Sequence, residues 1–365
     1  MSSSPFRIGF YALTLCSLTL FGAGCFGGTT ATPATGPDGG VFRTKTDVFG
    51  PGIEVVEWKQ LKLLNLNTKF GSIADVGTAS AAFDPQDPLT MYLGTIQNGL
   101  MFTSDGGESW QSSKGLSVGR IESIAVSPKD KCVIYVSRAN QIFKTKNCGR
   151  DWDQSFFDGR VDKRFTALAI DPKNENIVYA GTSDGDLFRS DNGGAAWRAT
   201  YRVEGIFIMN IVVDPHDSKL VYAASWGSGV LKSTDSGATW ISIRKPFQDF
   251  DRARFPRAVV LDPNVVNRVY HISRYGMLRS DDAGATWNPV TIASPNNTLD
   301  IRAMAIHPKD SKKLVYATDT NIAFSNDSGV TWTSRKLPTT RGASFILFDP
   351  SATPALFVGA QAVKQ

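Results

Sequence analysis

Short runs of apolar and β-branched residues, each followed by a polar turn, dominate the chain after its first 40 residues. Residues 165 to 201 show the pattern clearly, because Phe165–Ile170, Ile177–Gly181, Asp186–Ser190 and Trp197–Tyr201 are separated by turns rich in Asp, Asn, Gly and Pro. Runs of this length between such turns are typical of β-strands. No helical periodicity is evident in this part of the chain, so the pattern predicts an all-β protein built from four-stranded units.

The four-strand pattern recurs along the chain. The turn between the third and fourth runs carries the motif S/T-x-D-x-G-x-T/S-W, with copies at Thr103–Trp110, Thr145–Trp152, Ser190–Trp197, Lys232–Trp240, Ser280–Trp287 and Ser325–Trp332. Seven turns that contain Pro precede seven second strands, which are centred on Tyr92, Tyr135, Tyr179, Tyr222, Tyr270, Tyr316 and Phe357. Four strands every ~40–45 residues is the repeat of a β-propeller blade. The chain is therefore predicted to form a seven-bladed β-propeller.

The seventh blade is predicted to combine strands from both ends of the chain. Ser344–Phe348 and Leu356–Gly359 match the first two strands of a unit. Residues 40–44 match a third strand and 57–61 a fourth, and Lys45–Val56 between them is an enlarged, degenerate turn. Pairing the two ends would close the ring and leave no open sheet edge. We expect the propeller to span residues 41–365.

The turn motif resembles the Asp box, or BNR repeat. With the D-P-x(4–5)-V-Y-A-G-T pattern of Asp171–Thr182, the chain resembles sortilin-type propellers, the propellers of xyloglucan-degrading enzymes and the exported photosystem II assembly factors. The resemblance covers residues ~41–361 and implies the propeller fold, whereas propellers support many unrelated activities. Asn147 and Asn192 replace the motif Asp in two copies, and Ala196 replaces the residue before one Trp. The Arg-Ile-Pro motif of sialidases is absent from the sequence, and a two-propeller xyloglucanase cleft cannot be carried over to one propeller.

The first 40 residues predict export. Arg7 precedes the apolar run Ile8–Phe21, which is short for a membrane span, and Gly22–Gly24 lead to Cys25. Residues 1–25 resemble a bacterial lipoprotein signal in which Cys25 is lipidated, although Gly22 stands where that motif prefers Leu; the alternative is an ordinary cleaved signal. Residues 26–40, rich in Gly, Thr and Pro, are expected to be a flexible linker. We expect a lipid-anchored protein of the cell membrane or envelope, or otherwise a secreted or periplasmic one.

The repeated motif residues are expected to be structural. The Asp residues are predicted to accept hydrogen bonds from turn amides, the Gly to take a positive φ and the Trp to pack between blades. The boxes lack the alternating ligands and bidentate Glu of a calcium loop. These residues are Asp105, Asp235, Asp282, Asp327, Trp110, Trp152, Trp197, Trp240, Trp287 and Trp332.

Cysteine usage and composition narrow the chemistry further. Cys132 and Cys148 flank a hairpin predicted to turn near residues 139–140, so an oxidising compartment permits a disulfide between them; two free thiols are the alternative. The 365 residues carry a net charge of +5, with no concentrated basic stripe to favour nucleic acid. The three His residues show no zinc spacing. We expect no cofactor, no metal and a monomer.

Arginines at the starts of the first strands are the candidate binding residues. These strand starts surround one mouth of a propeller's central channel, and the longest connection on that face is Lys245–Pro256. The candidates are Arg120, Arg164, Arg252, Arg254, Arg257, Arg302 and Arg341, with Phe250 and Tyr275. Such a mouth would attract an acidic protein segment, an anionic glycan or another carboxylate. The alternative is that these Arg are solvated or paired with Asp158, Asp162, Asp251 and Asp300 in the same loops.

The sequence thus favours a non-catalytic binding or assembly module at the cell envelope, with a protein partner or an anionic ligand. The alternative is a glycoside hydrolase, sialidase-like or xyloglucanase-like, that uses Glu122 or Glu204 with Tyr201 or Tyr275. Such an enzyme needs two carboxyl groups at a defined separation. A purely structural spacer is a third interpretation.

Overall fold

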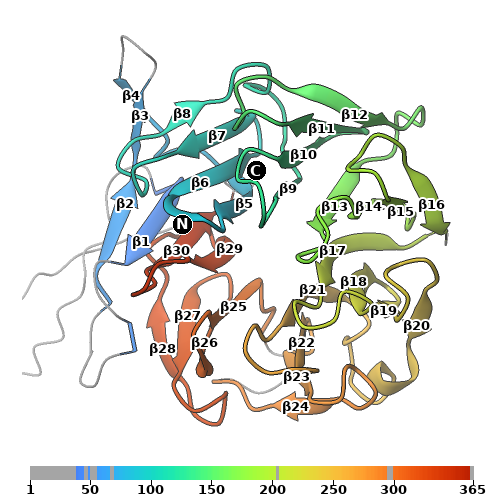
Figure 1. Ribbon diagram of the computed structural model, residues 1–365. Helices are drawn as coiled ribbons and strands as arrows, with labels where there is room; N and C mark the ends of the chain where they lie inside the picture. The colour runs from blue at the N-terminus through green and yellow to red at the C-terminus, as the bar shows by residue number, and fades with distance from the viewer. Residues whose placement is uncertain are drawn as a thin grey trace, which may run out of the picture. The chain divides into compact units, whose positions relative to one another are not determined.

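The computed structural model describes residues 38–44, 48–49, 56–65, 70–202, 205–293 and 299–361. The predicted signal with Cys25, most of the linker and most of the enlarged turn at 45–56 lie outside these ranges. Within them the chain forms seven antiparallel sheets of four strands each, which confirms the predicted seven-bladed propeller. Figure 1 shows these sheets arranged around a central axis.

Six blades are continuous in sequence. Blade 1 contains β5 (Thr78–Asp84), β6 (Asp87–Thr95), β7 (Leu100–Thr103) and β8 (Gln111–Ser112). Blade 2 contains β9 (Ser123–Val126), β10 (Ile134–Arg138), β11 (Gln141–Thr145) and β12 (Asp153–Phe157), and blade 3 contains β13 (Phe165–Ile170), β14 (Val178–Thr182), β15 (Leu187–Ser190) and β16 (Arg198–Tyr201). Blade 4 contains β17 (Phe207–Val213), β18 (Val221–Trp226), β19 (Gly229–Ser233) and β20 (Ile241–Ile243). Blade 5 contains β21 (Pro256–Leu261), β22 (Val269–Ser273), β23 (Met277–Ser280) and β24 (Asn288–Val290), and blade 6 contains β25 (Ala303–His307), β26 (Asp310–Ala317), β27 (Asn321–Ser325) and β28 (Thr333–Lys336).

Blade 7 joins the two ends of the described chain. Its strand order is β2 (Trp58–Leu61), β1 (Val41–Thr44), β30 (Leu356–Ala360) and β29 (Ala343–Phe348), as predicted. Val41 lies opposite Gly359 across the junction. The first strands β5, β9, β13, β17, β21, β25 and β29 each contact the next around the ring, so the ring is closed. Two elements were not predicted: the hairpin β3 (Leu63–Asn65) and β4 (Phe70–Ser72), and the short 3-10 helix η1 (Lys245–Phe247).

The core lies between blades rather than inside any one of them. The second strands are buried on both sides, since every residue of β14, β22 and β30 is buried. Their central aromatics are at most 4% exposed. The motif aromatics therefore mark the contact surface between neighbouring sheets, which explains why one landmark recurs in every unit.

The Asp box between β19 and β20 shows how the repeated turn is held. The hydroxyl of Ser233 accepts a hydrogen bond from the amide of Gly237 and donates one to Asp235, both 2.7 Å long. Asp235 in turn accepts from the amide and the hydroxyl of Thr239, at 2.9 and 2.6 Å. Ser236 and Gly237 both have positive φ, so two successive residues take the left-handed conformation. These contacts satisfy turn amides, and the same set forms around Asp105, Asp282 and Asp327.

Two boxes keep this geometry with Asn. The Oδ1 atoms of Asn147 and Asn192 accept the amides of Asp151 and Ala196, at 3.0 and 2.8 Å. An amide oxygen thus replaces one carboxylate oxygen, which explains why the turn tolerates the substitution.

The box tryptophans link neighbouring blades. The indole N–H of Trp240 donates to the Thr200 hydroxyl in blade 3, at 3.1 Å, and Trp152 and Trp197 contact blades 1 and 2 in the same way. Trp332 donates to the carbonyl of Thr291, which follows blade 5, and Trp110 and Trp287 are buried. The tryptophans therefore pack at the seams between sheets.

Cys132 and Cys148 form a disulfide. The amide of Cys148 also donates to the carbonyl of Cys132, because the pairing of β10 with β11 continues past Ile134 and Thr145. Cys148 occupies the positive-φ position of its Asp box. The bond therefore links the start of one strand to the turn that ends the next.

Candidate functional site

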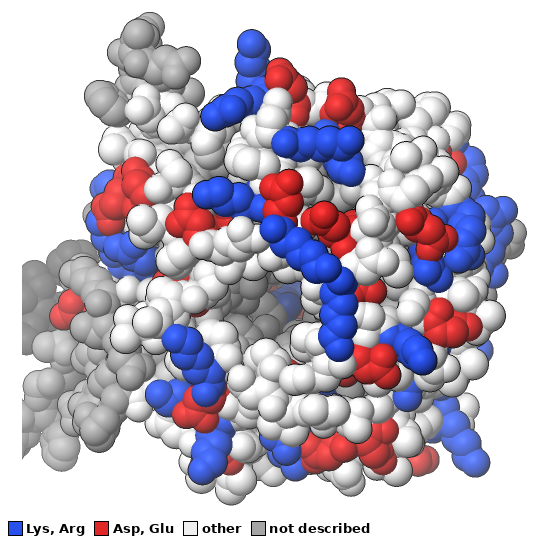
Figure 2. All heavy atoms as spheres, viewed as in Figure 1, with Lys and Arg blue, Asp and Glu red and all other residues white. Residues whose placement is uncertain are grey.

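The mouth of the central channel is a cavity of ≈ 520 Å³ to which all seven blades contribute. Three of the predicted arginines line it, from blades 2, 5 and 6. Its lining consists of Thr78, Ala79, Ile96, Arg120, Glu122, Thr166, Phe207, Met209, Arg257, Arg302, Ala343, Ser344 and Gln361. Figure 2 shows the ring hollowed at its centre, with basic and acidic side chains around the opening.

Bulges in the first strands direct side chains into this cavity. In five blades the register of the first strand shifts by one residue close to its start. The extra residues are Ala79, Thr166, Met209, Arg257 and Ser344, and each of them lines the mouth. An extra residue in one strand reorients a side chain that would otherwise alternate across the sheet. The lining is therefore set by a backbone irregularity that hydrophobic patterning does not reveal.

The arginines of the mouth are paired with carboxylates. Arg257 forms a two-point contact with Asp300, at 3.0 and 2.5 Å, and Arg302 forms one with Asp319, at 2.9 and 3.1 Å. Burial acts to lower the pKa of Arg302, but its hydrogen bonds to Asp319 and the charges of Asp300 and Asp319 raise it above its ordinary value. Both guanidinium groups are thus fixed in orientation at the rim.

Blade 2 supplies a third ion pair at the mouth. Arg120 donates to Glu122 at 2.6 Å, and a nitrogen of Arg164 lies 3.5 Å from the other oxygen of this carboxylate. Arg164 is half exposed and is not among the residues that line the cavity. Glu122 is the only carboxylate in the described lining of the mouth.

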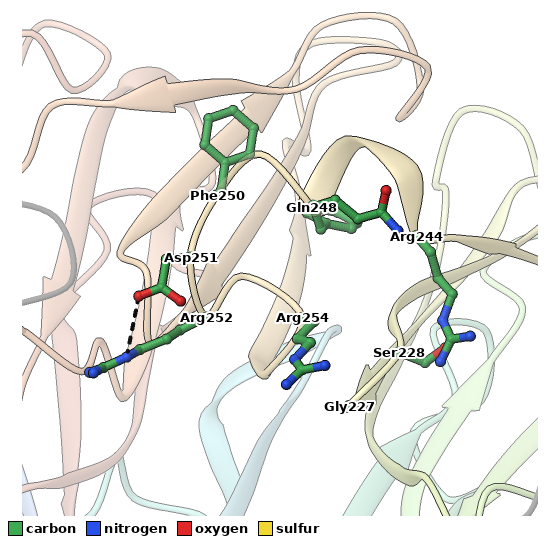
Figure 3. Close-up of a pocket in the computed structure, with 9 residues that line it drawn as sticks. Gly227, Ser228, Arg244, Gln248, Phe250, Asp251, Arg252 and Arg254 are labelled. Carbon is green, nitrogen blue, oxygen red and sulfur yellow. Dashed lines mark ion pairs between the residues drawn. The ribbon is translucent and has the colours of Figure 1, made fainter.

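A second cavity of ≈ 490 Å³ lies beside the connection between β20 and β21. It is lined by Gly227, Ser228, Arg244, Phe247, Gln248, Phe250, Asp251, Arg252 and Arg254. Figure 3 shows Arg244 and Arg254 on either side of the Gly227–Ser228 turn, whereas Arg252 extends away from it. We call this cavity the arginine pocket.

The charges of the arginine pocket are not balanced. Arg252 lies 3.6 Å from Asp251, the only carboxylate in the pocket's described lining. Arg244 and Arg254 form no ion pair with any described residue. The guanidinium of Arg254 instead lies over the ring of Phe255, 4.8 Å from its centre. Two cationic groups therefore remain available to a ligand.

Buried anchors hold the loop that carries these arginines. Phe247 is 3% exposed and stacks on His271, with ring centres 4.6 Å apart. Burial lowers the pKa of His271 to about 3, so its ring packs in the neutral form near neutral pH. Ala253 is fully buried, and the amide of Gly227 donates to the carbonyl of Arg254 at 2.9 Å. The loop is thus fixed at its two ends and against the facing turn.

Trp226 lies next to one residue of each cavity. The guanidinium groups of Arg257 and Arg274 lie over its ring, at 5.0 and 5.1 Å from the ring centre. Trp226 directly precedes Gly227 of the arginine pocket, and its ring lies 5.3 Å from that of Phe255. Cation–π contacts of this kind stabilise both partners. Trp226 therefore contacts Arg257 of the mouth and is the neighbour in sequence of Gly227 of the pocket.

The remaining predicted residues have other places. Arg341 forms ion pairs with Asp38 and Asp75, at 2.8 and 3.3 Å. These pairs connect the start of the described chain to blade 7. Tyr275 packs against Phe250, 5.2 Å between ring centres. Glu204 lies outside the described residues. Sequence reasoning missed Arg244, whose position directly before the long loop was the available signal.

Two further kinds of feature are absent from the described part of the chain. No group of three or more His, Cys, Asp or Glu side chains there has an arrangement that could hold a metal ion. Of the described residues, none form a helix of the length and apolarity that crossing a membrane requires.

Comparison with known proteins shows similarity of fold. Neither a family model nor a curated protein matches the sequence. Among solved structures, the GH74 enzyme of Niastella koreensis has a TM-score of 0.62 at 19% identity over 78% of this chain and 51% of that enzyme. YCF48 bound to D1 peptide has a TM-score of 0.60 at 16% identity, and the match covers 80% of this chain and 94% of that one. YCF48 from Cyanidioschyzon merolae has a TM-score of 0.58 at 17% identity, and the match covers 78% of this chain and 96% of that one. The chain spans about half the length of the GH74 enzymes it resembles and nearly the whole length of YCF48. The chain is thus a seven-bladed β-propeller with the architecture that YCF48 and GH74 xyloglucanases share.

Proposed function

We propose that this protein is an exported, non-catalytic binding module whose channel mouth holds an acidic segment of a partner protein. The observation that carries the proposal is the ring of oriented guanidinium groups from Arg120, Arg257 and Arg302 around one cavity. Each belongs to a different blade, so a bound segment would contact several sheets at once. The solved complex of YCF48 with D1 peptide, on a propeller of similar length, supports a peptide as the ligand.

The pairing of these arginines with Asp300, Asp319 and Glu122 suits an exchangeable site. A carboxylate of the partner would compete for guanidinium donors that are already oriented. Both partners of the two larger pairs keep some access to solvent, since the side chains of Arg257 and Asp300 are 18% and 24% exposed and those of Arg302 and Asp319 are 21% and 38% exposed, so a carboxylate of the partner can reach the guanidinium groups. Electrostatic attraction of this kind mainly raises the association rate and weakens with salt.

Peptide binding tests the proposal directly. Fluorescence anisotropy would be measured with labelled acidic, neutral and basic peptides of equal length, and with the D1 peptide. We expect the acidic peptides to bind most tightly, and the triple variant Arg120→Gln, Arg257→Gln, Arg302→Gln to lose about tenfold or more in affinity.

The control for peptide binding is the triple variant Arg198→Gln, Arg335→Gln, Lys336→Gln, which removes three positive charges, as the mouth variant does, but from outer strands that do not line the mouth. Equal losses in control and mouth variants would indicate a net-charge effect and contradict the site. Equal affinity for acidic and basic peptides would contradict the ligand class.

Attachment through a lipid on Cys25 is part of the proposal. Expression of the full chain with labelled fatty acid should label the wild type and leave Cys25→Ser unlabelled. An unlabelled wild type that is recovered cleaved and soluble in the exported fraction would favour an ordinary signal peptide instead.

Hydrolysis of a glycan is the alternative, because GH74 enzymes share the fold. A glycosidase requires two carboxyl groups about the reacting bond. The described lining of the mouth contributes only Glu122, and that carboxylate is paired with Arg120. We therefore expect the protein to release no reducing sugar from xyloglucan. If it does release sugar, and Glu122→Gln abolishes the release, the protein is a hydrolase rather than a binding module.

A further inference from the structure

The arginine pocket differs from the mouth in the state of its charges. In the mouth, each lining guanidinium is matched by a carboxylate. In the pocket, Arg252 is matched by Asp251, whereas Arg244 and Arg254 are matched by no carboxylate of the described chain. The described lining therefore has a net charge of +2, from three Arg and one Asp. An anion with two charges would balance it.

The donors of the pocket favour a tetrahedral oxyanion over a carboxylate. A guanidinium group presents its N–H donors as a planar fork, and one fork already occupies both oxygens of a carboxylate. Two guanidinium groups on opposite sides of one cavity therefore need a single acceptor with three or four oxygen atoms. Figure 3 shows Arg244 and Arg254 in this relation, with the Gln248 side chain above them. A phosphate group meets both requirements, charge and oxygen count.

The size and walls of the pocket indicate that the ligand is larger than phosphate alone. At ≈ 490 Å³ the cavity falls in the range of small-molecule sites. Phe250 forms part of its lining and packs against Tyr275. Figure 3 shows the Phe250 ring directed away from Arg244 and Arg254, so the wall nearest the two cations is the polar one of Gln248 and Ser228, which would contact an organic group attached to the phosphate.

The pocket is also held in place before any ligand binds. The Phe247 ring occupies the space beside Gly229, where an added Cβ would lie 2.8 Å from it. The amides of Ala253 and Phe255 donate to the carbonyls of Phe250 and Arg252, at 3.0 and 3.1 Å. Because little ordering remains to be done on binding, more of the interaction energy appears as affinity.

We propose that the arginine pocket binds a phosphate monoester, with the phosphate between Arg244 and Arg254 and the organic group beside Gln248 and Ser228. This site is separate from the peptide site of the mouth and does not depend on it. It is a binding site only, and no bond is made or broken there.

Isothermal titration calorimetry with four probes tests the proposal. Phenyl phosphate carries both the dianion and a ring, inorganic phosphate and inorganic sulfate carry the anion alone, and benzoate carries a ring with a carboxylate. We expect phenyl phosphate to bind most tightly and benzoate at least about tenfold more weakly. Equal affinity for benzoate would overturn the requirement for a dianion, and equal affinity for the inorganic ions would overturn the ester.

Variants locate the site. Arg244→Gln and Arg254→Gln should each lower the affinity for phenyl phosphate about tenfold or more. Lys245→Gln removes the same charge from the same loop without lining the pocket and should change the affinity less than about threefold. Circular dichroism would verify that the exposed substitutions leave the fold intact. Unchanged affinity in both arginine variants would overturn the assignment.

The pH dependence gives an independent readout. A phosphate monoester gains its second charge near pH 6, whereas sulfate keeps two charges throughout. Binding of phenyl phosphate should therefore strengthen from about pH 5 to 7.5, while that of sulfate stays level. The charged groups that face the ligand are Arg244, Arg252, Arg254 and Asp251. A parallel change for sulfate would place the titration in the protein and contradict the dianion.

Discussion

The phenol of Tyr222 donates a hydrogen bond to the carbonyl oxygen of Ala283, 3.0 Å away, and so joins the second strand of blade 4 to the Asp box of blade 5. Lys232 donates to the same oxygen at 2.7 Å. Tyr179 and Tyr135 make the equivalent bonds to Ser236 and Gly193. The two landmarks of the repeat, tyrosine and box, are therefore partners across each of these seams.

The variant Tyr222→Phe should lower the free energy of unfolding by about 0.5–1.5 kcal/mol, the usual net value of one hydrogen bond. Lys232→Met should cost a similar amount. The double variant should cost more than the sum, because the Ala283 carbonyl then loses both donors. Urea denaturation of the four proteins measures this coupling. Strict additivity would show that the two donors do not share the oxygen.

Acid should weaken the Asp boxes. The hydrogen bond from the Thr286 hydroxyl, with that from its amide, lowers the pKa of Asp282 to about 2. A carboxyl group whose pKa is lower in the folded state stabilises the fold at pH values above its pKa in the unfolded chain, which is near 4. This contribution is lost as the pH falls through the pKa in the folded state, about 2. The effect is at most about 1 kcal/mol per box, since the carboxylate is exposed and screened by solvent.

Melting temperatures between about pH 5 and pH 2 measure this effect. Asp282→Asn should melt lower than the wild type at neutral pH but fall less steeply in acid, because the amide cannot titrate. Asn192→Asp should do the reverse, since Asn192 already occupies a box in the same geometry. Parallel curves for all three proteins would exclude a role for these carboxylates in acid sensitivity.

Gly229→Ala should disturb the arginine pocket. Both Gly227 and Gly229 have positive φ, at 89° and 84°, but a Cβ at Gly227 would meet no atom within 4 Å, whereas one at Gly229 would press on Phe247. Gly227→Ala is thus the control for the backbone cost alone, about 1 kcal/mol. Gly229→Ala should cost clearly more in thermal unfolding. Equal costs would mean that Phe247 moves aside freely.

The disulfide should stabilise blade 2. Cys132 and Cys148 are 16 residues apart, and a crosslink of this span contributes about 3 kcal/mol in the chain-entropy treatment. The double variant Cys132→Ser, Cys148→Ser should lower the melting temperature, and reductant should lower that of the wild type only. A wild-type mass unchanged by reductant would show that the thiols are unpaired.

The fold could be predicted largely from sequence, whereas the candidate sites could be predicted only in part. Residues equivalent to Tyr179 and Trp240 recur at a regular spacing along the sequence, and this spacing gives the number and the limits of the blades. Arg257 and Arg254 lie three residues apart, and the structure sends one to the mouth and the other to a separate pocket. A bulge after Pro256 and a buried Phe247 cause this separation. Neither leaves a periodic signal in the sequence.

The sequence by itself determined the number of blades, the four strands of each and the closure of blade 7 by both ends of the chain. It could do so because a sheet that is buried on both sides requires apolar strands and polar turns at regular intervals. Every repeat must meet this requirement, so every repeat shows the same pattern. Only the tertiary structure decided which arginines are neutralised. The carboxylates of Asp300 and Asp319 reach Arg257 and Arg302 across 43 and 17 residues, while no described carboxylate reaches Arg244 or Arg254. Such pairing depends on where loops of different blades meet in space, which local sequence does not record.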